Sequence, residues 1–95
     1  MSQPDFLIHE DADNVGVMVV EGVTAGQTVV GLNMESQQTV EVRALNDIPL
    51  GHKIALIDFS EGDQVIKYAG KIGKIVEAVQ KGGHVHVQNC KTNRW

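Results

Sequence analysis

Four glycines stand at the centre of the same seven-residue pattern, with an apolar residue three positions before and three positions after each glycine. The four segments span residues 23–29, 48–54, 59–65 and 79–85. Glycine adopts the left-handed backbone conformation that many tight turns need, and apolar residues on both sides can then enter a core. The pattern predicts a short chain that reverses its direction four times.

The segments between these turns are typical of β-strands. They are short and apolar or alternating, and they cover residues 6–9, 15–21, 28–32, 39–45, 53–57, 65–68, 72–76 and 83–87. Val and Ile supply 21 residues, and β-branched side chains favour strands. Residues 65–79 also fit a helical spacing, but Gly70 and Gly73 would each cost a helix about 1 kcal/mol. We therefore predict an all-β fold, with eight short strands in a small barrel-like or clip-like arrangement.

The length of the chain limits what it can do alone. With 95 residues, it buries only about 60–65% of the surface that its unfolded form exposes. A self-contained enzyme with a deep pocket is therefore not expected, and the sequence indicates one part of a larger assembly. Cys90 is the single cysteine, which excludes an internal disulfide and a multi-cysteine zinc site. Because the sequence has neither a long apolar run nor a signal peptide, we expect a cytoplasmic protein that does not enter a membrane.

Charge is divided unevenly along the chain, although the formal net charge is −4. Residues 1–50 contain eight acidic residues and one basic residue, whereas residues 51–95 contain four acidic and seven basic residues. An acidic protein is not expected to bind nucleic acid. The basic end can face a small anion or an acidic partner, or its charges can simply be solvated. His9 lies among acidic residues and is expected to be solvated.

Two of the glycine turns are followed by histidines. His52 directly follows Gly51, and His84 and His86 follow the fourth turn. Because alternate residues of a strand share a face, His84, His86 and Gln88 are predicted to lie on one face and the valines between them on the other. Two imidazoles on one face can ligate a metal, bind an anion or transfer protons, or they can form an ordinary exposed polar face.

Three ordered segments, residues 48–59, 62–73 and 83–89, resemble the SAF domain of the altronate/galactarate dehydratase family. The resemblance extends from about Leu7 to Trp95. In that family the domain is either part of a long sugar-acid dehydratase or a separate small subunit. The resemblance implies a β-clip fold over residues 1–90, which agrees with the repeated glycine turns.

The resemblance also implies a β-elimination from a 2-hydroxy acid, in which a base removes the proton at C2 and a group leaves C3. The leaving group is hydroxide in the sugar-acid dehydratases, whereas the closing segment of this chain is similar to that of family members that release sulfite from sulfolactate. A large subunit is expected to carry most of the catalytic groups, including a divalent metal ion, which is expected to be iron. His52, His84 and His86 match histidines of the family and are expected to line the shared site, with Lys53 and Gln88 contacting the anionic substrate. A sugar-acid dehydratase subunit and a non-catalytic binding module are the alternatives.

The sequence departs from the family at Gln88, where a third histidine of the closing motif is common. Glutamine forms hydrogen bonds but is a poor metal ligand, so no metal is expected on this chain alone. Residues 91–95 form a short tail in which Arg94 and Trp95 have the character of interface residues, and we expect the tail to dock on the large subunit. A frayed terminus is the alternative.

Overall fold

The computed structural model describes residues 3–67, 70–86 and 89–92. Within these residues every regular element is a β-strand, and there is no helix that could span a membrane. The all-β prediction is confirmed, and strands rather than a helix form within residues 65–79. The strands are β1 (Phe6–Ile8), β2 (Val15–Met18), β3 (Thr28–Asn33), β4 (Thr39–Arg43), β5 (Lys53–Ala55), β6 (Gln64–Lys67), β7 (Gly70–Ile75), β8 (His84–Val85) and β9 (Cys90–Thr92).

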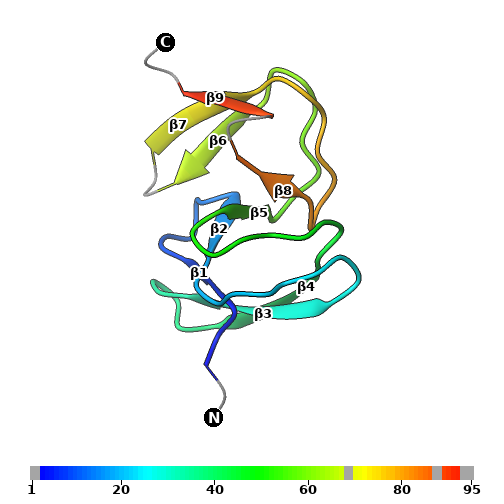
Figure 1. The fold of residues 1–95 in the computed structure, drawn as a ribbon. Coiled ribbons are helices and arrows are strands. Elements are labelled where there is room, and N and C mark those ends of the chain that lie inside the picture. Colours follow the sequence, from blue (N-terminus) through cyan, green and yellow to red (C-terminus); the bar gives the residue numbers. More distant parts are fainter. Residues whose placement is uncertain (1–2, 68–69, 87–88, 93–95) are drawn as a thin grey trace.

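The strands form two sheets at opposite ends of the molecule (Figure 1). The larger sheet has the order β4-β3-β1-β2-β5-β8, and the smaller has the order β6-β7-β9. The pairing of β1 with β3 is parallel, and the other strand pairings are antiparallel. Strand β9 was not predicted. Since β9 pairs with β7, the boundary expected after residue 90 falls inside a strand of the smaller sheet.

The four glycine turns form as predicted. The central glycines have positive φ angles, 92° at Gly26, 85° at Gly51, 96° at Gly62 and 91° at Gly82. In each turn the residue after the glycine donates its N–H to the carbonyl three positions earlier, at 2.8–3.1 Å. A glycine with positive φ at the third position is the signature of a type II turn.

Each turn also docks on one residue of another segment through two backbone hydrogen bonds. The turn around Gly51 is bonded in this way to Met18, and the turn around Gly82 is bonded to Ala55. The other two turns dock equivalently on Ala44 and Ile75. An isolated bridge between Val23 and Ile48 joins the first two turns, and one between Phe59 and Val79 joins the last two. We call each such pair of turns a two-turn clip, and the described residues contain two of them. The strands that leave the second turn of each clip, β5 and β8, pair with each other.

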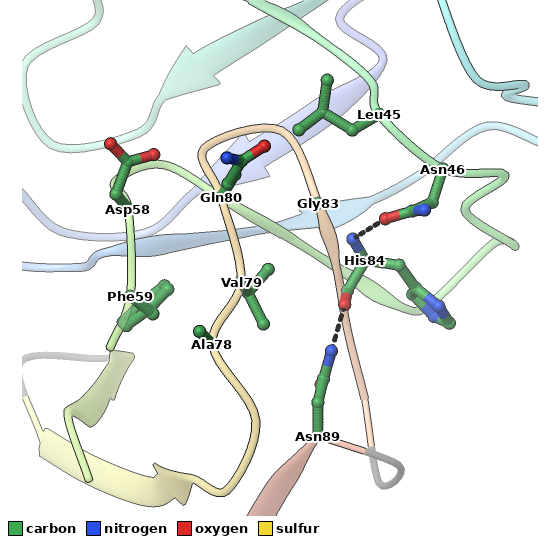
Figure 2. Close-up of a pocket in the computed structure, with 10 residues that line it drawn as sticks. All are labelled: Leu45, Asn46, Asp58, Phe59, Ala78, Val79, Gln80, Gly83, His84 and Asn89. Atoms are coloured by element: carbon green, nitrogen blue, oxygen red, sulfur yellow. Dashed lines mark hydrogen bonds between the residues drawn. The ribbon is translucent and has the colours of Figure 1, made fainter. Parts of the chain in front are cut away.

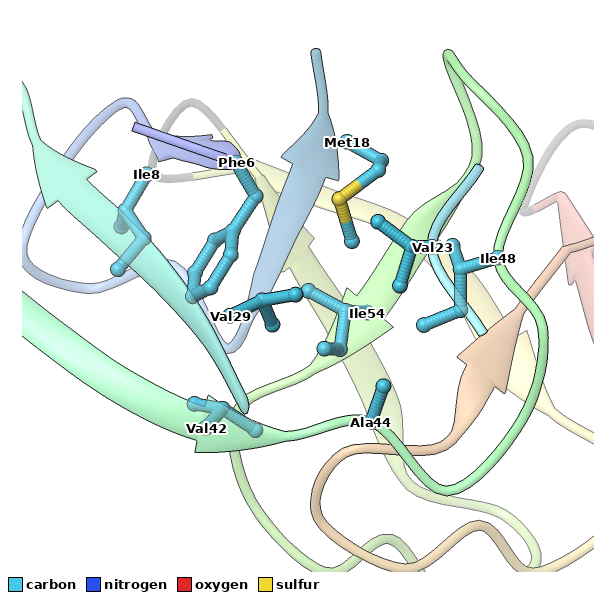
Figure 3. Close-up of a cluster of buried hydrophobic side chains, with 9 residues drawn as sticks. All are labelled: Phe6, Ile8, Met18, Val23, Val29, Val42, Ala44, Ile48 and Ile54. Atoms are coloured by element: carbon cyan, nitrogen blue, oxygen red, sulfur yellow. The ribbon is translucent and has the colours of Figure 1, made fainter. Parts of the chain in front are cut away.

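The apolar residues that flank the glycines fill two cores. One core lies within the larger sheet, around Phe6, Met18 and Ile54 (Figure 3). The other lies between the sheets, around Phe59, Val65, Ile75, Val79 and Val85. All eight flanking apolar residues of the four patterns are buried, four in each core. Both parts of the turn prediction, the backbone conformation and the burial of its flanks, are therefore confirmed.

Two glycines make room for the Phe6 ring. A Cβ atom at Gly31 would overlap that ring, and one at Gly16 would do the same. We expect Gly31→Ala to lower the free energy of unfolding by about 1–3 kcal/mol, because a packed core resists added volume. The smaller side chain of Phe6→Leu should make the double variant more stable than the sum of the two single effects predicts. Urea denaturation of the four proteins tests this, and additive effects would contradict it.

Candidate functional site

Three histidines from two different turns lie together. His52 Nδ1 is 2.7 Å from His84 Nε2, within hydrogen-bonding distance. The ring of His86 stacks on that of His52, with centroids 3.6 Å apart and an interplanar angle of 15°. The centroids of His84 and His86 are 5.9 Å apart, with an angle of 9° between the rings. We call these three residues the histidine cluster.

The duplicated clip explains why these side chains meet. His52 is the last residue of its turn and precedes β5, and His84 opens β8. The antiparallel pairing of these strands places Lys53 opposite Val85 and Ile54 opposite His84. His86 lies just beyond β8, and its ring is nearly parallel to that of His84. Val85, between them, is fully buried.

Two asparagines hold the backbone that carries the cluster. Asn46 Oδ1 accepts the N–H of His84 at 3.0 Å, and Asn89 Nδ2 donates to the His84 carbonyl at 2.7 Å (Figure 2). Asn89 Oδ1 also accepts the N–H of His86 at 3.0 Å. Since β8 is an edge strand of the larger sheet, these amides satisfy main-chain groups that no neighbouring strand can reach. Sequence reasoning missed both asparagines, although Asn beside a turn is a common partner for backbone groups.

Burial and neighbouring positive charges disfavour protonation of His84 and His86. The pKa of His84 is lowered from 6.5, chiefly by burial and then by the positive charges that His52 and His86 can carry. The pKa of His86 is also lowered, first by desolvation, then by His52 and by the ammonium of Lys53. An anion bound nearby would offset this repulsion and favour the imidazolium form. His84 and His86 can therefore act as proton acceptors, or bind an anion together with a proton.

The remaining predicted site residues are placed as follows. Lys53 is half-buried on β5 and acts electrostatically on His86. Gln88, Arg94 and Trp95 lie outside the residues that the structure describes. The expectation that His9 is solvated is wrong. It is half-buried, and its Nδ1 is 3.0 Å from Nζ of Lys67 on β6.

The described residues contain no group of three or more His, Cys, Asp or Glu side chains that could hold a metal ion. Within the histidine cluster, Nδ1 of His52 faces Nε2 of His84, and the ring of His86 stacks on His52. Metal ligands must instead point their lone pairs at one common position.

The lowered pKa values predict how the stability of the isolated chain depends on pH. The pKa values of His84 and His86 lie below 6.5 in the folded chain and near 6.5 in the unfolded chain. At a pH between the lowered values and 6.5, the unfolded chain therefore binds more protons than the folded chain. The free energy of unfolding should fall as the pH falls through this range. His52→Gln removes a charge that acts on both histidines and should weaken this dependence. Urea denaturation between about pH 7.5 and 5.5 measures it. Equal pH dependence in the wild-type chain and the variant would contradict this electrostatic account.

Comparison with known proteins gives consistent matches. The sequence profile of the altronate/galactarate dehydratase SAF domain matches residues 4–93. A protein named (2R)-sulfolactate sulfo-lyase subunit alpha, from Chromohalobacter salexigens, is 47% identical over 91 residues, which cover 96% of this chain and 97% of the relative. A protein with the same name from Paracoccus pantotrophus is 59% identical over 49 residues, 52% of this chain and 73% of the relative. Altronate dehydratase from Escherichia coli (strain K12) is 40% identical over 81 residues, which cover 85% of this chain but 15% of the dehydratase.

Proposed function

Because this chain belongs to the altronate/galactarate dehydratase SAF domain family, we propose that it is one subunit of a lyase that cleaves (2R)-sulfolactate into pyruvate and sulfite. The observation that carries the choice of substrate is the 47% identity to a sulfo-lyase subunit alpha over nearly the full length of both chains. The word "subunit" in the names of these relatives supports a second chain in the active complex.

The proposed reaction is a β-elimination. A base removes the proton at C2 of sulfolactate, and the electrons of the C2–H bond form the C2–C3 double bond. The C3–S bond breaks, and its electrons leave with sulfite. The resulting enol takes up a proton at C3, loses the proton of its C2 hydroxyl, and so becomes pyruvate. Because a proton next to a carboxylate is weakly acidic, the reaction requires a positioned base and positive charge near the carboxylate.

We assign these two requirements to the histidine cluster and Lys53. Lowered pKa values keep His84 and His86 available as neutral bases near neutral pH. Lys53 supplies a fixed positive charge beside His86 for the carboxylate or the sulfonate. Gln88 is proposed as a further hydrogen-bonding contact to the substrate.

The larger subunit is proposed to supply the rest of the site, including a divalent metal, with iron as the proposed ion. In the altronate dehydratase of Escherichia coli the matching region is 15% of a longer chain. This supports the proposal that the domain acts together with a much larger polypeptide. Arg94 and Trp95 are proposed to contact that subunit, since Arg and Trp are frequent interface anchors.

A second candidate is a subunit of a sugar-acid dehydratase, in which hydroxide leaves instead of sulfite. The observation that favours it is the 40% identity to an altronate dehydratase over 81 residues. A role in binding or assembly without catalysis is the third candidate, because the same fold can serve other functions.

The assay that separates these candidates uses the chain co-expressed with the proposed larger subunit. We expect equal amounts of sulfite and pyruvate from (2R)-sulfolactate, and a kcat/KM at least about 100-fold lower for dehydration of altronate or galactarate. Dehydration of a sugar acid without sulfite release would assign the complex to the second candidate. An assembled complex that is inactive on all three substrates would contradict both enzymatic assignments.

A further inference from the structure

An open pocket of about 640 Å³ lies beside the edge strand β8 (Figure 2). Phe59 and Val79, which are buried, contribute apolar surface to it, and the exposed side chain of Leu45 adds more. Asn46 and Asp58 contribute polar groups. We propose that this pocket receives a segment of the larger subunit that carries an apolar side chain next to a lysine or an arginine. The proposal rests on the proposed function only in requiring that subunit.

The pocket lies behind the histidine cluster. The backbone of His84 lines the pocket, whereas its imidazole extends to the other side of β8 (Figure 2). Asn46 and Asn89, which hold the backbone of His84 at 3.0 and 2.7 Å, also line it. A segment bound here would therefore contact the residues that hold His84. A partner bound in the pocket would cover the edge strand β8 on the side opposite the His84 imidazole.

The polar groups of the pocket indicate the chemistry of its occupant. Asp58 Oδ1 accepts the backbone N–H of Lys81 at 2.8 Å, which leaves Oδ2 available to a ligand. Apart from His84, whose ring points away, Asp58 is the titratable residue among the described residues that line the pocket. An anionic occupant is therefore disfavoured, and a lysine or arginine complements the carboxylate.

The rest of the pocket fits an extended segment. Asn46 uses its Oδ1 for His84, and its Nδ2 can donate to a carbonyl of an incoming chain. The exposed Leu45 and the apolar atoms of Phe59 and Val79 can contact one side chain of that segment. Apolar anchors surrounded by polar groups are typical of the energetic centre of a protein interface.

The test measures the affinity of this chain for the purified larger subunit, without substrate, by isothermal titration calorimetry. We expect Leu45→Glu and Asp58→Lys each to raise Kd by about 10-fold or more. Met34→Glu is the control for the first, because Met34 is 45% exposed and Leu45 is 41% exposed. Asp47→Lys is the control for the second, because Asp47 Oδ1 accepts the N–H of Ala25 at 3.0 Å just as Asp58 accepts that of Lys81. Both controls should change Kd by less than about threefold.

Circular dichroism on heating establishes whether each variant is folded. If Leu45→Glu does not fold, the result for Asp58→Lys tests the proposal by itself. Wild-type affinity in a folded Asp58→Lys chain would overturn the proposal. The wild-type chain could instead form a dimer on its own. If Leu45→Glu disrupts that dimer but leaves the affinity for the larger subunit unchanged, the occupant of the pocket is a second copy of this chain. That result would also overturn the proposal. Because no substrate is present, these outcomes do not depend on whether the complex releases sulfite.

Discussion

Replacing His84 and His86 together by alanine is expected to lower kcat for sulfite release by the assembled complex about 10²–10⁴-fold, the usual contribution of a positioned acid or base. Both backbones are held by Asn46 and Asn89 rather than by the rings, so the variant should still fold. Removing these two rings takes away the proposed bases, while Lys53 remains to attract the anionic groups of the substrate.

The measurement compares kcat and KM of the two complexes over a range of pH, with size-exclusion chromatography to establish assembly. His9→Gln is the control, because His9 lies outside the cluster and contacts Lys67 instead. Its kcat should remain within about twofold of the wild-type value. Full activity of the His84→Ala/His86→Ala complex, with assembly intact, would show that the cluster has no catalytic role.

Gly82→Ala is expected to be far more destabilising than the same change at Gly26. Both glycines have a positive φ, 91° and 92°, so an alanine is strained at either position. That strain alone costs about 1–2 kcal/mol. At Gly26 a Cβ would meet nothing within 4 Å, whereas at Gly82 it would overlap the carbonyl oxygen of Arg43. Because a backbone atom cannot move aside cheaply, Gly82→Ala should cost more than about 3 kcal/mol, a large part of the stability of a small domain.

Urea denaturation followed by circular dichroism measures both free energies of unfolding. The Gly26→Ala protein should remain folded with a modestly lower midpoint, and the Gly82→Ala protein should be largely unfolded or close to it. Equal losses at the two positions would mean that the close approach of this turn to Arg43 does not contribute to stability. Since the turn leads directly into His84, the same variant should also reduce binding of the larger subunit.

The turns could be predicted from sequence because their signal is local. A glycine and two apolar residues within seven positions specify both the backbone conformation and the side chains that enter the core, as Gly51, Ile48 and Ile54 illustrate. The choice of strands over a helix near Gly70 and Gly73 was local in the same way, since glycine penalises a helix wherever it lies.

The parts that escaped prediction depend on contacts distant in sequence. Strand β9 is short and includes the exposed Lys91, and only its pairing with β7 makes it a strand. His52 and His84 are 32 positions apart, and only the family resemblance placed them in one site, because no local pattern indicates that β5 and β8 are neighbours. The contact of His9 with Lys67 spans 58 positions. The predicted roles of Gln88, Arg94 and Trp95 remain predictions.

We propose that this chain completes an active site that the larger subunit cannot form alone. This proposal is tested by measuring sulfite release from (2R)-sulfolactate by each purified subunit separately and by the two mixed in increasing ratio. We predict negligible release by either subunit alone, and a rate in the mixture that rises with added chain and then saturates. Full activity of the larger subunit alone, unchanged by addition of this chain, would contradict the claim.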